Sequence, residues 1–260
     1  MRVYTLIENT ALSSRFACEH GLSLYIEVGN RKILFDAGQT DAFIKNASLV
    51  NVDLSAVDTA ILSHGHYDHG DGFVSFLECN DCASIYLSEA AVHPFFNAKG
   101  KYIGLNPRLL TSNRLVLVTD DLDLGDGLRL VSCKHSNTHY PGSSNGLQLE
   151  SNGIRQQDLF QHEQYLVIQE NGRRYCFCGC AHRGVLNVLE WTRPDYFLGG
   201  FHFKDVPPDS AELVRIAQTM MELPTVFYTG HCTGVEQFCT MKSVMGQRLH
   251  YLSAGTVIDL

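Results

Sequence analysis

The chain has 260 residues, 45% of them hydrophobic, and a formal net charge of -8. That length is enough to bury a sizeable core, whereas an acidic chain without a basic run is a poor partner for the phosphate backbone of a nucleic acid. No stretch is apolar and long enough to cross a bilayer, and residues 1–16 lack the apolar core of a signal peptide. We therefore expect a cytoplasmic protein without a membrane partner.

Predicted strands dominate the first part of the chain. Each run is rich in β-branched or aromatic residues and is bounded by Gly, Asn or Asp, a pattern that is typical of strands. The predicted strands cover residues 2–8, 22–28, 32–38 and 59–64, and helices are expected over residues 41–50 and 72–79.

Strands and helices alternate in the second part of the chain. Strands are predicted over residues 114–120, 127–133, 164–170, 174–180, 195–201, 225–230 and 249–260, with helices over 184–191, 210–223 and 235–246. A run of strands followed by alternating strands and helices predicts two packed sheets with helices outside. We expect one α/β domain over residues 1–260.

Potential metal ligands are concentrated in one short segment. The apolar run 60–62 leads into the pattern H-x-H-x-D-H, formed by His64, His66, Asp68 and His69. A loop at a strand end can direct the first two histidines to one cation and the last two residues to a second cation. Imidazole and carboxylate suit zinc, iron(II) or manganese, and two cations about 3.5–4 Å apart hold a bridging hydroxide. The alternative is a solvated polar loop.

Four ligands cannot fill two coordination spheres, and the chain supplies more at other predicted strand ends. Each follows an apolar or aromatic run and lies beside glycine, which permits close approach of the backbone. These residues are Cys180, His182, His202 and His231. One such histidine alone is typical of a surface residue, but several at successive strand ends predict a common rim.

The chain has nine cysteines. Because no export signal is present, free thiols or metal ligands are expected rather than disulfides. Cys79 and Cys82 form a C-x-x-C pattern without a second pair at zinc-ribbon spacing. We interpret them as two thiols near a turn, with a structural zinc site as the alternative.

In its motifs, the chain resembles the metallo-β-lactamase superfamily. H-x-H-x-D-H is the signature of that superfamily, and Asp36 in "ILFDAG" matches its aspartate at the end of an early strand. The resemblance covers nearly the whole chain and implies an αββα sandwich with a dinuclear metal site along one edge. The motifs "EHGLSLYIE", "GCAHRGVLNVL", "LGGFHF" and "GHCTG" look like the branch that includes 7,8-dihydropterin-6-methyl-4-(β-D-ribofuranosyl)aminobenzene 5′-phosphate synthase.

Two departures from the superfamily pattern affect the expected ligand set. Cys180 stands where the superfamily commonly has a bridging aspartate, and a thiolate ligand favours zinc over iron or manganese. The superfamily's third histidine for the first metal has only a loose match at His139. The resemblance therefore implies two divalent ions, zinc first. His64, His66 and His182 would hold one ion, and Asp68, His69 and His231 would hold the other. His139 is the alternative to His182.

Other polar residues near the expected site have two interpretations each. Asp36 is expected to hold a ligating histidine through its ring N–H, and the alternative is a helix N-cap. His20 reaches the cleft or lies in a simple turn. His202 binds substrate or donates a proton, and the alternative is a packing histidine. Lys204 and Arg183 contact a phosphate or carboxylate, or remain solvated surface charges.

The segment 90–104 lies outside the ligand motifs and contains His93, Phe95, Phe96 and Tyr102. Its aromatic rings could stack on a flat heterocycle if the segment formed a lid over the cleft. We favour the alternative, a satellite hydrophobic cluster.

The resemblance implies a metal-dependent hydrolase in which a metal-bound hydroxide acts on a small phosphorylated or heterocyclic substrate, with Asp68 and His202 as catalytic residues. A dihydropterin synthase-type transferase or lyase is the alternative within enzymes. An iron redox protein or a non-catalytic binding protein on the same fold is the alternative from another class.

Overall fold

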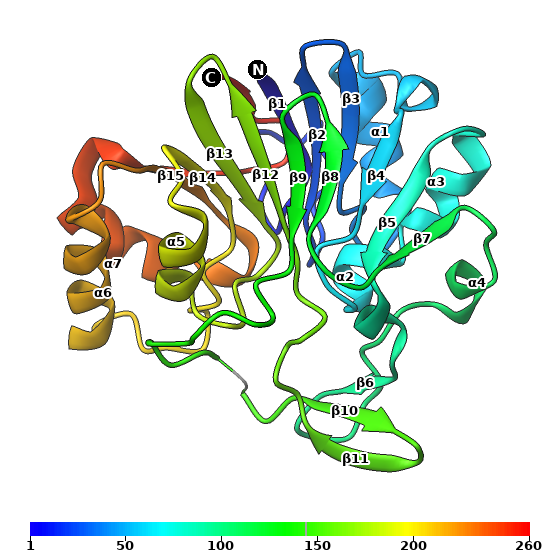
Figure 1. Ribbon diagram of the computed structural model, residues 1–260. Coiled ribbons are helices and arrows are strands. Elements are labelled where there is room, and N and C mark those ends of the chain that lie inside the picture. Colours follow the sequence, from blue (N-terminus) through cyan, green and yellow to red (C-terminus); the bar gives the residue numbers. More distant parts are fainter. Residues whose placement is uncertain (144) are drawn as a thin grey trace.

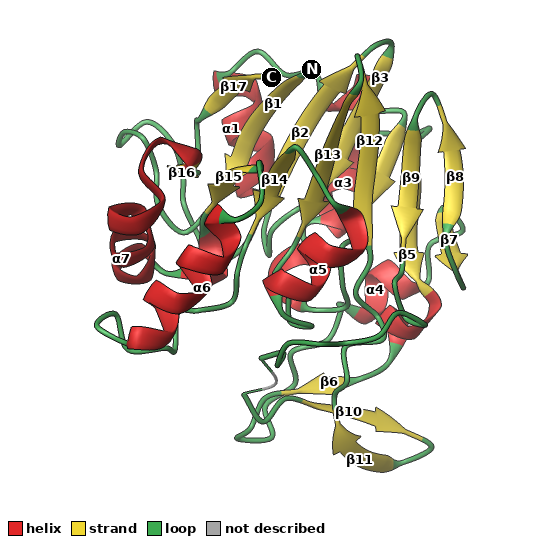
Figure 2. Cartoon of the chain, turned by 60° about the vertical axis from the view of Figure 1, so that its left-hand side comes forward, coloured by secondary structure: helices red, strands yellow, loops and turns green. Residues whose placement is uncertain are grey.

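The computed structural model describes residues 1–143 and 145–260 (Figure 1). Two seven-stranded sheets pack face to face, and helices cover the outer faces of both (Figure 2). This arrangement confirms the predicted αββα sandwich.

The first sheet combines antiparallel and parallel strands. Its order is β17-β1-β2-β3-β4-β5-β7, and the strands from β3 to β7 run parallel to one another. Strand β5 was not predicted from the sequence. The bounds are β1 Arg2–Ile7, β2 Ser23–Val28, β3 Arg31–Phe35, β4 Thr59–Ile61, β5 Ser84–Ser88, β7 Leu115–Val118 and β17 Val257–Asp259.

The second sheet has the order β16-β15-β14-β13-β12-β9-β8. Strands β13 to β16 run parallel, and β8, β9 and β12 pair antiparallel. The hairpin strand β8 was also not predicted. The bounds are β8 Leu122–Gly125, β9 Leu128–Val131, β12 Tyr165–Glu170, β13 Arg173–Cys178, β14 Tyr196–Gly199, β15 Val226–Thr229 and β16 Leu249–Tyr251.

The helices are short and mostly amphipathic, and each outer layer has its own hydrophobic cluster. No helix among the described residues is long and apolar enough to cross a membrane. Helices α1 Ala42–Leu49, α3 Phe73–Cys79 and α4 Pro107–Leu110 cover the first sheet, and α5 Val185–Thr192, α6 Ala211–Met221 and α7 Val235–Met245 cover the second.

Successive side chains of strand β13 point to opposite faces of the second sheet. Tyr175 and Phe177 of β13 point into the cluster between the two sheets, whereas Cys176 and Cys178 point into the cluster beneath the helices. Phe177 is fully buried, and burial of such a side chain stabilises the fold by about 1.5–3 kcal/mol. The central core therefore holds the two sheets together.

A small antiparallel sheet projects from the end of the sandwich opposite the chain termini (Figure 1). It consists of β6 Phe95–Phe96, β10 Gln148–Ser151 and β11 Ile154–Gln157. The sequence did not predict it, because β11 is exposed throughout and shows no apolar alternation.

Candidate metal centre

Loops that follow several strands of the two sheets meet at one edge of the sandwich. His64, His66, Asp68 and His69 follow β4, and the last two lie in the short helix α2 Tyr67–Gly70. Cys180 and His182 follow β13, and His231 follows β15. Carboxyl ends of parallel strands form a common edge, and ligand sites concentrate there. All seven side chains are buried, with at most 8% of any residue exposed.

The first group of ligand atoms comes from His64, His66 and His182, whose ligand atoms lie within 4.8 Å of one another. Nε2 of His64, Nε2 of His66 and both ring nitrogens of His182 are buried without a hydrogen-bond partner in the described chain. Buried polar atoms are normally satisfied, so this set of orphaned nitrogens fits a cation. Phe160 stacks on the His182 ring at 4.4 Å between centroids.

The second group comes from Asp68, His69, Cys180 and His231. His69 Nε2 lies 3.1 Å from His231 Nε2 and 3.3 Å from Cys180 Sγ. Asp68 Oδ2 lies 3.4 Å from His231 Nε2 and 3.9 Å from His69 Nε2. Ligands at about 2.0–2.3 Å in a tetrahedral zinc site are roughly 3.3–3.8 Å apart. The four separations, from 3.1 to 3.9 Å, lie within a few tenths of an ångström of that range, so the group suits a divalent cation.

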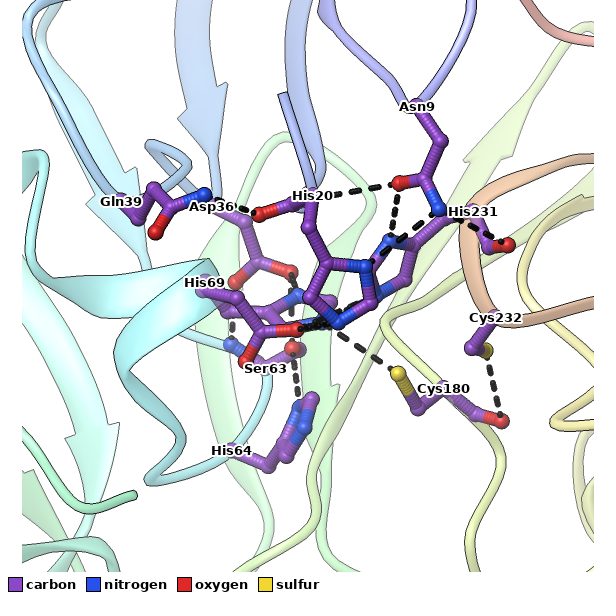
Figure 3. A network of polar contacts seen from close by, with 12 residues as sticks. Asn9, His20, Asp36, Gln39, Ser63, His64, His69, Cys180, His231 and Cys232 are labelled. Carbon is purple, nitrogen blue, oxygen red and sulfur yellow. Dashed lines mark hydrogen bonds and ion pairs between the residues drawn. The ribbon is translucent and has the colours of Figure 1, made fainter. Parts of the chain in front are cut away.

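Hydrogen bonds link Asp36 to residues of both ligand groups (Figure 3). Its carboxylate accepts hydrogen bonds from the Ser63 amide and hydroxyl at 2.7 Å, and it lies 2.7 Å from His69 Nδ1. Because the Ser63 hydroxyl gives its proton to Asp36, it accepts at 2.8 Å from Nδ1–H of His64. Nε2 of His64 is thus left as a bare lone pair facing the site, and the contact with Asp36 fixes the His69 ring with its Nε2 toward the same site.

Two further buried acids hold the other loops, and the sequence did not reveal them. Glu163 accepts from the His182 amide at 2.7 Å and from the Arg183 amide at 3.2 Å. Glu8 accepts from the His231 amide and from the Tyr251 hydroxyl. Neither Glu8 nor Glu163 is more than 1% exposed. Each acid therefore fixes one ligand-bearing turn through its backbone.

The loop backbones are tightly constrained around the two groups. Asp36, Ala181, His202 and His231 all adopt left-handed conformations, with φ between 50° and 57°. Such conformations are uncommon for residues other than glycine and concentrate at functional sites. Gly179 allows the loops to meet, because a Cβ at this position would lie 2.2 Å from Ser63 Oγ.

Charges at the site are strongly coupled. Burial acts to lower the pKa of His69, but Asp36 and Asp68 outweigh it and raise that pKa to about 9. Burial opposes ionisation of Asp68, yet His69, His20 and His231 lower its pKa well below the usual range. Burial lowers the pKa of His66 to about 3 and that of His231 to about 3. The two latter imidazoles are therefore neutral at pH 7, as metal ligands must be.

Cys180 supplies the soft donor of the second group. Burial, together with the neighbouring Cys232, raises the pKa of its thiol well above the ordinary value, so a cation is needed to hold it as a thiolate. Cys232 donates from Sγ to the Cys180 carbonyl at 3.6 Å. The sulfur atoms of these two cysteines and a ring nitrogen of His231 lie within 4.8 Å of one another. Sequence reasoning missed Cys232.

His202 and His20 flank the two groups at the cleft. The His202 ring lies 4.1 Å from the ring of His182, and its Nδ1 lies 2.9 Å from Ser143 Oγ. Burial and Lys204 lower the pKa of His202 to about 4. His20 Nε2 lies 3.2 Å from Asp68 Oδ2, with 36% of its side chain exposed.

The structure places His139 away from both groups, which corrects its assignment to the site. Its side chain is 56% exposed, and Nδ1 lies 2.9 Å from Glu190 Oε2. Arg183 also turns away, because its guanidinium donates to the Ser132 carbonyl and lies over the Trp191 ring at 4.4 Å.

Another buried pair supports the first group and was not predicted. His162 Nδ1 accepts from the Gly65 amide at 2.9 Å, and Nε2 lies 2.9 Å from Asp158 Oδ2. Because Nδ1 accepts, Nε2 carries the proton and donates to Asp158. This pair fixes the loop between His64 and His66. No motif spacing could have indicated it, because Gly65 and His162 are 97 residues apart.

The two groups open on a cavity of about 460 Å³. Asn97, Ala98, Lys99 and Ile103 line one wall, and the aromatic residues of that segment do not belong to the lining. Phe95 instead packs on His162, and Phe96 packs on Tyr102, as a satellite cluster would. The remaining lining residues are His20, His66, Tyr67, Asp68, Asn145, Leu147, Cys180, His182, His202, Lys204, Asp205, His231 and Cys232.

The thiols of the C-x-x-C segment contact backbone carbonyls. Cys79 Sγ lies 3.4 Å from the Phe76 carbonyl, and Cys82 Sγ lies 3.6 Å from the Val57 carbonyl. Neither cysteine belongs to any group of potential ligands found among the described residues.

The family model of the metallo-β-lactamase superfamily matches residues 17–147. The chain is 30% identical to the uncharacterized protein MJ0448 of Methanocaldococcus jannaschii, and the match covers 98% of both chains. It is 27% identical to 7,8-dihydropterin-6-methyl-4-(beta-D-ribofuranosyl)-aminobenzene-5'-phosphate synthase of the same organism, over 99% of this chain and 96% of the relative.

Solved structures agree with these relatives. Tm1679, described as a metal-dependent hydrolase of the beta-lactamase superfamily, superposes with a TM-score of 0.87 at 27% identity, covering 100% of this chain and 99% of the other. Zn(2+)-bound PqqB of Methylobacterium extorquens shares the fold with a TM-score of 0.62 at 13% identity, and the match covers 100% of both chains. Fold, motif and relatives agree, and the chain belongs to the metallo-β-lactamase superfamily.

Proposed function

We propose that this protein is a metal-dependent hydrolase that uses two divalent cations to act on a small anionic substrate. The observation that carries the proposal is the pair of adjoining ligand groups at the wall of a 460 Å³ cavity, one of three orphaned histidines and one of close-packed carboxylate, imidazole and thiol donors. Both groups are built on strand ends and held by buried acids, so the site is pre-organised.

His64, His66 and His182 would hold the first cation, and Asp68, His69, Cys180 and His231 the second. Such a pair of cations would supply Lewis acidity and lower the pKa of a bound water molecule to near neutrality. The thiol of Cys180 favours zinc over harder ions such as manganese. The protein's own contribution is to fix these donors, keep them dry and orient the substrate.

Two lysines support an anionic substrate. Lys99 and Lys204 line the same cavity from different loops. Both lysines are exposed. Ammonium groups at the cavity wall suit a phosphate or carboxylate. His202, held by Ser143 at 2.9 Å, would orient the reacting part of such a substrate.

A second candidate is the transferase or lyase chemistry of the dihydropterin synthase relative. It is supported by 27% identity over 99% of this chain, which includes every ligand-bearing loop. The same two cations and the same lysines would serve a phosphate-bearing heterocyclic substrate. The two candidates differ in the group that attacks the bond being broken. Water attacks it in the hydrolase, and a second organic group attacks it in the transferase.

The test combines metal analysis with a substrate panel. Protein purified without chelator should contain two equivalents of divalent metal and should hydrolyse at least one phosphodiester, phosphomonoester, lactone or thioester. Asp68→Asn should abolish that activity, whereas Asp209→Asn, an exposed control, should not change it. At most one bound metal after loading with zinc, or hydrolysis that survives Asp68→Asn, would contradict the proposal.

A further inference from the structure

Asn9 contacts two histidines, His20 and His231 (Figure 3). Both Nε2 atoms lie near Asp68 Oδ2, at 3.2 Å for His20 and 3.4 Å for His231. Ligand atoms of the three residues also lie within 4.8 Å of one another. By distance alone, His20 and His231 could serve equally as metal ligands.

Two backbone groups fix the orientation of the Asn9 amide. The Gly21 amide donates to Asn9 Oδ1 at 3.3 Å, and Asn9 Nδ2 donates to the His231 carbonyl at 3.4 Å. A backbone N–H can only donate and a carbonyl can only accept. A flipped amide would place N–H against N–H and oxygen against oxygen, so the orientation follows from the backbone.

The orientation of Asn9 determines the proton position on His231. His231 Nδ1 lies 2.9 Å from Asn9 Oδ1, which is an acceptor only. Nδ1 must therefore carry the proton of the neutral ring. Nε2 is left as a bare lone pair toward Asp68 and His69, which is the form that binds a metal ion.

Asn9 has the opposite effect on His20. His20 Nδ1 lies 3.4 Å from Asn9 Nδ2, which is a donor only. Nδ1 therefore accepts, and the ring proton resides on Nε2. That N–H points at Asp68 Oδ2 at 3.2 Å, and the His20 ring also lines the cavity.

We propose that Asn9 is a positioning residue that makes the two histidines chemically unequal. His231 presents a lone pair to the second cation, whereas His20 presents an N–H to Asp68 and is not a ligand. The inference rests on the proposed metal site for its functional meaning. Its content, the two tautomers and their dependence on Asn9, is a property of this chain that can be measured with or without metal.

The experiment reads the tautomers directly. Protein labelled with ¹⁵N-histidine is observed by long-range ¹H–¹⁵N correlation, with zinc and after chelation, and single His20→Gln and His231→Gln variants assign the two rings. We expect a proton on Nδ1 of His231 and a proton on Nε2 of His20. A proton on Nδ1 of His20, or zinc bound to its Nε2 in the loaded protein, would overturn the proposal.

Two substitutions of Asn9 separate its donor from its acceptor. Asn9→Asp keeps an acceptor for His231 but removes the donor to His20, so the His20 proton should move to Nδ1 while His231 keeps its tautomer and its zinc affinity. Asn9→Ala removes both contacts and should weaken zinc binding at the second site by roughly 10–100-fold, as loss of an orienting partner does. An unchanged His20 tautomer in Asn9→Asp, or unchanged zinc affinity in Asn9→Ala, would contradict the role of Asn9.

Asn137→Asp, at an exposed position, is the matched control and should change neither tautomer nor zinc affinity. Zinc stoichiometry, measured separately by elemental analysis, distinguishes this inference from the proposed function. A protein that shows the two expected tautomers but binds no zinc would support the role of Asn9 and contradict the dinuclear site. A protein that binds two zinc ions with His20 as a ligand would support the dinuclear site and contradict the role of Asn9.

Discussion

Asp36 Oδ2 lies 2.7 Å from His69 Nδ1, and both side chains are fully buried. The same carboxylate reaches His64 through the Ser63 hydroxyl, so one residue orients a ligand in each group. Asp36→Ala should therefore weaken binding of both cations, by roughly 10–100-fold each. Competition titration with a zinc chelator measures this change. Asp209→Asn is the control, and normal affinity for both cations in Asp36→Ala would contradict the orienting role.

Substitution of two histidines tests the first ligand group. His182→Ala removes one of three clustered donors and should reduce the metal content from two equivalents to about one. His139→Ala removes a surface ring paired with Glu190 and should leave the metal content unchanged. Elemental analysis after dialysis gives both values. Full occupancy in His182→Ala together with loss of a metal in His139→Ala would reverse the assignment.

Cys180 should determine the absorption spectrum of a cobalt ion at the second site and the preference of that site among metal ions. Cobalt(II)-loaded protein should show a near-ultraviolet thiolate-to-cobalt absorption that Cys180→Asp loses completely, whereas Cys239→Ser, at an exposed cysteine, keeps it. Cys180→Asp should still bind two cations, with preference shifted from zinc toward manganese because the new donor is harder. If Cys180→Asp retains the absorption, the sulfur donor is not Cys180.

Two lysines should contribute to substrate binding rather than to chemistry. Lys99→Met and Lys204→Met each remove an ammonium group from the cavity wall while keeping a long side chain. A charge-assisted hydrogen bond contributes about 1.5–3 kcal/mol, so KM for an anionic substrate should rise by roughly tenfold or more. The kcat value and the KM for a neutral substrate should change little. A fall in kcat with unchanged KM would place these lysines in the chemical step instead.

Asp58 should support stability without affecting the site. Partial burial alone would raise its pKa, but three donors outweigh that effect and lower it. They are the Lys32 amide at 2.7 Å, the Thr59 hydroxyl at 2.7 Å and Arg31 Nε at 2.9 Å. Because the folded-state pKa lies below the unfolded value of about 3.9, the stabilisation is present above that pH and is lost as pH falls through the folded-state pKa.

Asp58→Asn should therefore lower the free energy of unfolding at pH 7 by about 1 kcal/mol or less, since the carboxylate is partly solvated. Urea unfolding of the chelated protein at pH 7 and at pH 3 gives the comparison, and the difference from the unsubstituted protein should shrink at pH 3. Zinc affinity should not change. A difference that grows as pH falls would contradict the direction of the pKa shift.

Sequence patterns predicted most elements that bury an apolar face, with the buried strand β5 as an exception, and they failed for the small sheet that does not. The buried strand β13 and the amphipathic helix α6 were predicted close to their observed bounds. The small sheet of β6, β10 and β11 was missed, because its strands are short and β10 and β11 are only partly buried or exposed. Pairing between distant segments stabilises such strands, and a local pattern does not record it.

The sequence by itself determined the donor types and their places at strand ends, because H-x-H-x-D-H is local and glycines mark the loops that follow β13, β14 and β15. Only the tertiary structure decided that His182 rather than His139 joins His64 and His66, and that Glu8, Asn9 and Glu163 hold the ligand loops. Glu8 and His231 are 223 residues apart in the chain. A contact between such distant residues depends on how the two sheets pack, and no spacing within the sequence encodes that distance.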